Sequence, residues 1–311
     1  MCGPLERAVR LQLALILGAV WLLGRTVPDT LPSARFAWAA PALENPVTVE
    51  LGDGYTYTRL LKNHDYIIQL PQNSVKNGAT FIEGGRNLII QGGHIRVPAG
   101  GESDTQRRAL YIKNASGIVH IEGILIDGAD RDGFDGIAIS APQAIVQIVN
   151  VRIMHVTGRF DGFHGDVIQP FGGVRELRVD HLTASSSYQG LYLPETQGAI
   201  GSVILRNINL SYDFNIYDET TYLLWLPVDR ETCHLSYPVT IDHVYIDPRP
   251  EQDVAGSAVW PNSLVPPGCP ATQGPDGVHW PALTDVTGSV LPGAPPAGDF
   301  VPESSFGFEG R

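Results

Sequence analysis

The chain has 311 residues, and 43% of them are hydrophobic, which is enough for one large domain with a substantial core. Its net charge is −12 and it has no run of Lys or Arg, which argues against nucleic acid and anionic membrane surfaces as partners. The 34 glycines and 24 prolines favour many turns and little helix.

Residues 1–39 have the pattern of an export signal. Arg7 and Arg10 precede an apolar stretch of 14 residues, 11–24, which is short for a membrane span of about 20 residues. Small residues at 37–39 offer a cleavage site, although it lies farther from the apolar stretch than is usual. We therefore expect a secreted, periplasmic or cell-surface protein, with an uncleaved N-terminal anchor as the alternative.

Residues 45–262 carry a repeated strand pattern with no helical periodicity, and 45–72 is expected to cap its first coil. Apolar positions recur at spacings of 31, 27, 31, 26 and 36 residues. Each is followed, three and five residues later, by further apolar or small residues, with polar or small residues between them. This first column consists of Ile90, Ile121, Ile148, Val179, Leu205 and Ile241.

A second column of short strands lies about halfway round each coil. Period-two alternation of apolar side chains marks strands with one buried face. Its members are residues 110–112, 137–139, 166–168, 191–193 and 224–226. Strands that cannot bury a face alone must stack, so the sequence predicts an all-β solenoid, a single-stranded parallel β-helix. A β-propeller is the competitor, but its blades need four strands in about 40–45 residues.

Two segments of the predicted solenoid are near copies. Residues 132–136 read Asp-Gly-Phe-Asp-Gly, and residues 161–165 read Asp-Gly-Phe-His-Gly, 29 residues later. Aligning the coils on Gly136, Gly165 and Gly190 places Asp135, His164 and Gln189 in one column, with neighbours about 4.7–4.9 Å apart between backbones. The same alignment puts Asp166 in a slot that is apolar on the neighbouring coils, with Gln169 three residues later.

A carboxylate in an apolar slot is costly unless it is paired, so Asp166 and His164 are the candidate acid–base centre, supported by Asp135, Gln169 and Gln189. A carboxylate beside imidazole raises the pKa of the imidazole and permits proton transfer. Two carboxylates could instead act as acid and base in glycoside hydrolysis. The alternative is structural: Asp residues at coil corners, such as Asp132 and Asp161, also form turns.

A calcium site is a further alternative, because four carboxylates lie within nine residues. Asp127, Asp130 and Asp132, with Asp135, could supply oxygen ligands for Ca²⁺, although the spacing is not that of an EF-hand loop. An acidic solvated turn would give the same pattern.

Outward-facing aromatic residues on successive coils could bind sugar rings. Tyr192 and Trp225 occupy the middle positions of their strands, and Glu195 is an acid on the same side. Cover by the C-terminal tail is an equal alternative for these aromatics. That tail, residues 263–311, is rich in Pro and Gly and is expected to be irregular, packed along the solenoid or partly disordered.

The cysteine count favours one disulfide. Cys2 belongs to the export signal, so Cys233 and Cys269 form the remaining pair in an exported chain. Two free buried thiols are the alternative. Neither cysteine has the spacing of a metal site.

The sequence of residues 81–93, together with the coil pattern, resembles the right-handed parallel β-helix superfamily of pectate lyases and polygalacturonases over residues 65–262. The resemblance implies an extracellular protein, with polysaccharide cleavage or modification as its dominant activity and adhesins and tailspikes as non-enzymatic members. Of the hydrolase motifs, residues 134–137 partly match the first and residues 165–167 the second. The third and fourth motifs of that branch are missing from this chain.

These features lead to an expected secreted enzyme that cleaves a polysaccharide, as a lyase or a glycoside hydrolase. His164 would transfer the proton and Asp166 would orient it or act as the partner acid. A lyase would need calcium or an arginine to neutralise a uronate carboxylate, and Arg131 and Arg159 are the candidates. The alternative is a non-catalytic surface β-helix with a glycan-binding, adhesive or structural role.

Overall fold

The computed structural model describes residues 36–98, 103–128, 132–213, 222–229, 231–264 and 268–306. Most of the expected signal segment therefore lies outside the described residues, as do Asp130 and Arg131. Residues from Phe36 onwards form one compact unit. No helix among the described residues is long and apolar enough to cross a membrane.

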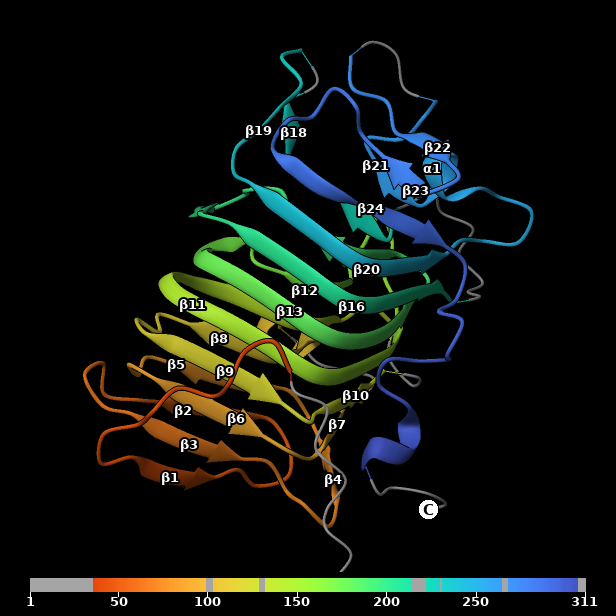
Figure 1. Ribbon diagram of the computed structural model, residues 1–311. Helices are drawn as coiled ribbons and strands as arrows, with labels where there is room; N and C mark the ends of the chain where they lie inside the picture. The colour runs from red at the N-terminus through yellow and green to blue at the C-terminus, as the bar shows by residue number, and fades with distance from the viewer. Residues whose placement is uncertain are drawn as a thin grey trace, which may run out of the picture. The chain divides into compact units, whose positions relative to one another are not determined.

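The fold is all-β, and most strands pair in parallel with a strand one repeat later (Figure 1). A repeat is the stretch of chain that contributes one strand to each of two faces, named sheet A and sheet B. Sheet B contains β2 (Thr56–Arg59), β5 (Thr80–Glu83), β8 (Arg108–Lys113), the first part of β11 (Asp135–Val156), β12 (Asp166–Gln169), β14 (Gln189–Tyr192), β17 (Leu224–Trp225) and β21 (Val259–Trp260).

Sheet A stacks the longer strands, from β1 at the bottom of Figure 1 to β24 at the top. It contains β1 (Val47–Glu50), β3 (Tyr66–Gln69), β6 (Leu88–Gln91), β9 (Ile118–Glu122), the second part of β11, β13 (Gly172–Ser186), β16 (Val203–Tyr212), β20 (Val239–Asp247) and β24 (Val286–Pro292). Shorter strands that pair alongside are β4 (Val75–Asn77), β7 (His94–Arg96), β10 (Leu125–Asp127) and β15 (Gly198–Ile200).

The register of sheet A confirms the first predicted column. Ile90 pairs with Ile121, Ile121 with Ile148, and the pairing continues through Val179 and Leu205 to Ile241. Every one of these side chains is at most 3% exposed. The column therefore forms a continuous apolar core between the faces, in a topology compatible with a solenoid.

A corner with left-handed backbone bends each longer strand of sheet A. Asn150, His181, Asn207 and His243 have φ of 53°, 58°, 49° and 53°, and Gly123 has φ of 68°. These residues follow the first column by two positions on their strands, so the bends stack along the sheet. Asn and Gly tolerate this region of φ and ψ better than most residues, which explains the polar and small residues between apolar positions.

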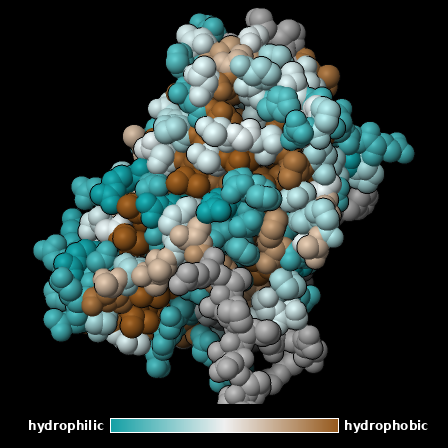
Figure 2. All heavy atoms as spheres, viewed as in Figure 1, coloured by the Kyte–Doolittle hydropathy of each residue, from teal (hydrophilic) through white to brown (hydrophobic). Residues whose placement is uncertain are grey.

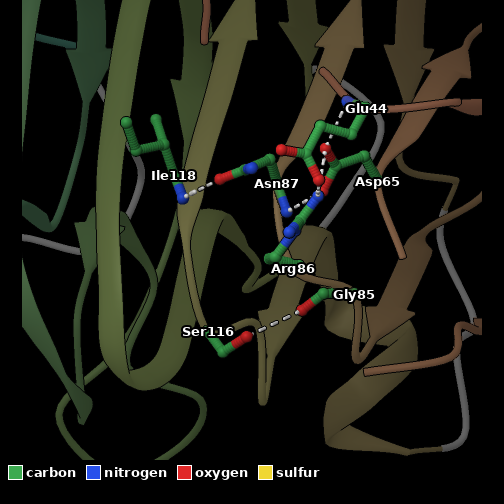
Figure 3. A network of polar contacts seen from close by, with 7 residues as sticks. All are labelled: Glu44, Asp65, Gly85, Arg86, Asn87, Ser116 and Ile118. Atoms are coloured by element: carbon green, nitrogen blue, oxygen red, sulfur yellow. Dashed lines mark hydrogen bonds and ion pairs between the residues drawn. The ribbon is translucent and has the colours of Figure 1, made fainter. Parts of the chain in front are cut away.

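At the N-terminal end, a charged network joins the first repeats (Figure 3). The buried Asp65 carboxylate accepts two bonds from the Arg86 guanidinium, at 2.7 and 2.9 Å, and one from the Glu44 backbone N–H at 2.7 Å. Those Arg86 bonds, with backbone donors, hold the pKa of Asp65 well below its usual range. Asn87 continues the network by accepting the Ile118 N–H at 3.0 Å.

Before it reaches this network, the chain crosses sheet A. The Ala37 N–H donates to Asp180 of β13 at 2.7 Å, and the Phe36 ring contacts the His181 ring at 5.2 Å. On the face drawn in Figure 2, hydrophilic and hydrophobic side chains are interspersed over these strands.

The C-terminal region, expected to be irregular, contains strands. β24 adds a parallel strand beside β20, and β22 (Thr272–Gly274) and β23 (Gly277–His279) pair antiparallel at that end. The Cys233–Cys269 disulfide is present, as predicted. The remaining elements are the hairpin of β18 (Val228–Asp229) and β19 (His234–Leu235), the helix α1 (Val254–Ser257), and the 3₁₀ turns η1 (Asp104–Arg107) and η2 (Glu303–Phe306).

After β24, the chain runs back along sheet A. Asp299 accepts bonds from Arg152 at 2.7 Å and from Asn209 at 3.0 Å, and the Val301 N–H donates to Thr183 at 2.9 Å. The Phe300 ring lies 6.1 Å from the His181 ring. Segments from both ends of the described chain therefore contact the same corner of β13.

Replacing the corner residue Asn150 tests the role of the left-handed bend. Asn150→Val should lower the free energy of unfolding by about 1–2 kcal/mol, because a β-branched side chain clashes at positive φ. Asn150→Gly should change it by only a few tenths of a kcal/mol. Denaturant unfolding measures both. The control Thr240→Val, at an exposed position of β20, should be nearly neutral, and an equal loss in both valine variants would contradict the assignment.

Candidate functional site

Four polar residues lie side by side at the starts of strands in sheet B. Asp135 pairs with Arg108 of β8, and Asp166 of β12 pairs with Gln189 of β14. Because Ile137 pairs with Ile168, Asp135 and Asp166 also lie at the same level on neighbouring strands. The observed column is therefore Arg108, Asp135, Asp166 and Gln189.

The predicted placement of His164 beside Asp135 is wrong by two residues. The alignment on Gly136 and Gly165 put Asp166 in the apolar slot, but Ile168 occupies that slot, opposite Ile137 and Leu191. The expected register of 166–168 was therefore also wrong, whereas strands 110–112, 137–139, 191–193 and 224–226 pair as predicted. The two similar segments sit differently relative to their strands: residues 161–165 end just before β12, whereas residues 132–136 extend into β11. Aligning their glycines therefore gave the wrong register.

This polar column lies on the side of sheet B that faces away from the core. A Cβ placed on Gly136 would approach the core side chain of Ile153 at 2.7 Å, so position 136 faces inward. Val167, which follows Asp166, also belongs to the core. Ile168 is a core residue as well, so strict alternation does not hold from Asp166 to Ile168. The outward side of the column is indicated by Arg108, which contacts Asp135 and packs on the Tyr111 and Phe171 rings outside the main core.

The two carboxyl groups are nevertheless buried. The exposed fractions of Asp135 and Asp166 are 1% and 0%. Asp135 accepts the backbone N–H of Asp166 at 3.1 Å and the Arg108 Nε at 3.3 Å. Both carboxyl oxygens of Asp166 are buried, and neither has a hydrogen-bond partner among the described residues. A buried ionised carboxylate without partners is strongly unfavourable, so burial favours the protonated form of Asp166.

This environment changes the acidity of both groups. Burial raises the pKa of Asp135 to about 7, against the opposing effect of the Arg108 charge. Burial and the neighbouring Asp135 charge raise the pKa of Asp166 well above its usual range. Near neutral pH, one of two such neighbouring carboxyls can be protonated while the other is ionised, so that the pair contains both an acid and a base.

Aromatic rings hold Arg108 over the pair. Its guanidinium carbon lies 5.1 Å from the centre of the Tyr111 ring and 4.6 Å from that of Phe171. Rings at these distances attract a cation and limit its movement. Arg108 therefore supplies a positioned positive charge beside Asp135.

A pocket of about 410 Å³ opens near the N-terminal ends of these strands. Among the described residues, those lining it are Asp104, Arg107, Asp132, Gly133, Arg159, Gly162 and Phe163. Burial is the main cause of the raised pKa of Asp135, and the negative charge of Asp104 in the pocket lining adds to it. Arg107 precedes Arg108 directly, so one segment contributes to both.

His164 lies on a loop beside this pocket and is exposed. The loop is closed by a bond from the Arg159 N–H to the Phe163 carbonyl at 2.9 Å. The His164 Nε2 atom lies 3.0 Å from the Phe160 carbonyl oxygen, and its ring contacts the rings of Phe160 and Tyr188. Its position therefore suits contact with a bound molecule better than a proton relay with Asp135.

The outward aromatic residues predicted on sheet B form a longer row. Tyr192 pairs with Trp225, and Trp225 with Trp260, with ring centres 5.4 and 5.6 Å apart. Tyr222 contacts both tryptophans. All four rings are partly exposed. The row is therefore accessible enough to contact sugar rings, although each ring also supports its neighbours.

The other candidates are more dispersed. Gln169 pairs with Ala138 in the row that continues to Tyr192. Exposed Glu195 accepts the Ile200 N–H at 2.7 Å, a local turn contact. Asp161 is exposed, 3.6 Å from Arg159.

The acidic residues considered for calcium do not converge within the described structure. Asp127 pairs with His155 at 3.0 Å and with Arg96 at 3.6 Å. Asp132 lines the pocket instead, and its carbonyl accepts a bond from Arg107 at 2.8 Å. Residues 36–98, 103–128, 132–213, 222–229, 231–264 and 268–306 contain no group of three or more His, Cys, Asp or Glu that could hold a metal.

Several residues of the site were missed from the sequence, among them Arg108, Trp260 and Asp104. Arg108 precedes Asp135 by one repeat, so the repeat spacing could have revealed it. Trp260 follows Trp225 in register, but its strand of two residues gives little periodicity. Asp104 lies in η1, outside the strand pattern, and had no signal of this kind.

Comparisons with protein-family models, with curated proteins and with solved structures find no match to this chain. The site must therefore be interpreted from its own geometry.

Asp166→Asn tests the electrostatic cost of the pair. A pKa raised by folding means that the protonated form favours the folded state. The contribution of both groups is thus fully present below about pH 4. The contribution of Asp135 is lost as pH rises through about 7, and that of Asp166, whose pKa is raised well above its usual range, is also lost as pH rises. The neutral amide should make the protein more stable than the parent at pH 8 by at least about 1 kcal/mol, a melting temperature about 2–4 °C higher.

The difference between variant and parent should shrink towards pH 4, where the parent carboxyls are protonated. Thermal unfolding across this pH range measures it, with Asp276→Asn at an exposed position as the matched control. Groups with a lowered pKa, such as Asp65, give the same pH dependence of stability in variant and parent, so their contribution cancels in the difference. The assignment would be contradicted if the stability of the variant relative to the parent were lower at pH 8 than at pH 4.

Proposed function

We propose that this protein is a secreted enzyme that cleaves a polysaccharide, built as a single-stranded right-handed parallel β-helix with Asp135 and Asp166 as its acid–base pair. The stacked register of sheets A and B supports the β-helix. The disulfide between Cys233 and Cys269 supports an oxidising compartment, that is, a secreted, periplasmic or cell-surface location. The apolar segment 11–24 of the sequence supports export in the same way.

The observation that carries the proposal is the buried carboxyl pair. Stable folds avoid burying two carboxyls side by side, and such departures concentrate at functional sites. Asp135 is bonded to Arg108, but among the described residues neither oxygen of Asp166 has a hydrogen-bond partner, whereas a purely turn-closing role would require one. A pair in which one carboxyl is protonated and the other ionised is suited to chemistry that needs an acid and a base together.

Cleavage of a glycosidic bond needs both roles. In hydrolysis, the protonated carboxyl donates to the glycosidic oxygen, and the ionised carboxylate activates water or attacks the anomeric carbon. In β-elimination, the carboxylate removes a ring proton and the acid protonates the leaving oxygen. Arg108 stabilises the ionised state of Asp135 during either reaction. Because both carboxyls are buried, the proposal requires that polysaccharide binding uncover at least one of them.

Residues around the pair have supporting roles. His164 and Arg159 would contact substrate from the pocket loop, and Gln169 and Gln189 flank the pair on sheet B. The row of Tyr192, Trp225 and Trp260 would hold sugar rings farther along the same sheet. Calcium near Asp127–Asp132, which the sequence suggested, has no cluster of ligands among the described residues, and a chelator tests any dependence on it.

A non-catalytic glycan-binding role is the second candidate. It is favoured by the partly exposed aromatic row, which needs no catalytic group to bind sugars. The two candidates differ in one outcome, because only the enzyme breaks bonds.

The test is a screen of the full-length secreted protein on soluble polysaccharides. Product formation is followed by new reducing ends and by ultraviolet absorbance of unsaturated products, which separates hydrolase from lyase. We expect Asp135→Asn and Asp166→Asn each to lower kcat/KM by at least about 100-fold, since both groups move protons in the reaction. His164→Ala should lower it by less than about tenfold.

The control Asp276→Asn should retain parental activity. The rate should have a bell-shaped dependence on pH, because one carboxyl must be protonated while the other is ionised. Assays with calcium and with a chelator show whether the metal is needed. Full activity in Asp166→Asn would exclude the pair as the centre, and binding of glycans without any cleavage would leave the second candidate.

A further inference from the structure

The pocket beside the carboxyl pair has a balanced charge. Its described lining contains two arginines, Arg107 and Arg159, and two aspartates, Asp104 and Asp132. It therefore presents hydrogen-bond donors and acceptors together, around a volume of about 410 Å³ that lies within the range of small-molecule sites.

Both guanidinium groups already have protein partners. Arg107 donates to the backbone carbonyls of Asp132 at 2.8 Å and Gly133 at 3.3 Å, and its guanidinium lies 5.5 Å from the Phe163 ring centre. Arg159 lies 3.6 Å from the Asp161 carboxylate. Arg159 is therefore paired with a carboxylate, whereas the bonds of Arg107 fix its position without neutralising its charge.

A carboxylate bound in this pocket would meet two aspartates as well as two arginines, so the described lining gives it no net attraction. Asp104 and Asp132 line the same cavity, and the whole chain carries a net charge of −12. Like charges at short range repel, and the protein's overall field does not attract a polyanion. The electrostatics thus disfavour a uronate or a sulfated sugar.

Hydroxyl groups of a neutral sugar match the lining. Each hydroxyl both donates and accepts, so carboxylate acceptors and guanidinium donors can bind neighbouring hydroxyls without a buried unpaired charge. Phe163 provides an apolar surface for the C–H face of the ring. Phe160, 78% exposed, follows Arg159 on the same loop and adds a second aromatic surface next to the pocket.

Gly133 keeps this lining compact. Its φ is +78°, and a Cβ there would approach the Phe163 Cβ at 3.0 Å and an Arg107 nitrogen at 3.3 Å. A side chain at this position would therefore separate Arg107 from Phe163.

We infer that the pocket lined by Asp104, Arg107, Asp132 and Phe163 binds a neutral sugar unit of the polysaccharide, through its hydroxyl groups, and that the substrate is accordingly a neutral rather than an acidic polysaccharide. This inference rests on the proposed function for the identity of the reaction, but the binding itself does not require catalysis.

The test is calorimetric titration of the full-length secreted protein and of Asp166→Asn with oligosaccharides of equal length. Neutral probes are glucose-, mannose-, galactose- and xylose-based, and acidic probes are galacturonate- and mannuronate-based. At least one neutral series should bind, with an affinity that changes little between low and high salt, because no net charge is neutralised. The uronate series should bind at least about tenfold more weakly, as expected for an anion at a lining without net positive charge on a chain of net charge −12.

Pocket variants locate the binding. Asp104→Asn should weaken the neutral probe by about tenfold, as loss of a charged hydrogen-bond acceptor does. Gly133→Ala, checked for folding by its unfolding transition, should weaken it further by disturbing Arg107 and Phe163. The control Asp276→Asn should bind as the parent does. Unchanged affinity in Asp104→Asn would place the sugar elsewhere and overturn the inference.

The outcomes separate the two claims. Neutral-sugar binding with no cleavage of any polysaccharide would support the pocket and reject the enzyme. Cleavage of a uronate polymer, with preferential binding of uronate probes, would support the enzyme and reject the neutral-sugar inference. Neither binding nor cleavage would reject both.

Discussion

Registration of each strand with the strand one repeat later is the constraint on which the structure depends. A strand of four or five residues cannot bury its apolar face by itself. Stacking Ile121 on Ile148, and Ile148 on Val179, makes one continuous core from many short strands. The left-handed bends at Asn150 and at the equivalent positions of other repeats turn the chain in the same way in each of them. A shift of register by one residue would turn the core face outward, so the apolar pattern is strongly selected by burial.

The same constraint explains what could be read from the sequence. An apolar side chain indicates that its position is buried, and the column from Ile90 to Ile241 was therefore predicted correctly. Glycine carries no such information, because it tolerates many conformations and has no side chain to bury. The alignment on Gly136 and Gly165 consequently failed by two residues. That error moved His164 into a column where Asp166 belongs.

The candidate site could be predicted only in part, since it depends on the pairing of β11 with β12. Asp135, Asp166 and Gln189 were recognised as unusual polar residues at strand positions, and the structure does place them on neighbouring strands. Their depth of burial and the approach of Arg108 depend on the fold around them. No local pattern encodes the absence of a partner for Asp166, which makes its carboxyl so different from the well-bonded Asp65.

The contact of two flanking segments, which contain Phe36 and Phe300, with His181 has a mechanical consequence. In a linear array of repeats, each unit is held only by its neighbours, so loss of structure usually begins at the termini. Here Phe36 and Phe300 rest on a residue in the interior of the stack, and Asp299 links to Arg152 and Asn209 on different repeats. The flanking segments therefore connect repeats that are not neighbours in the stack. Unfolding that starts at either terminal repeat would first have to break contacts with a repeat in the middle of the stack. The repeats should therefore unfold together rather than one after another.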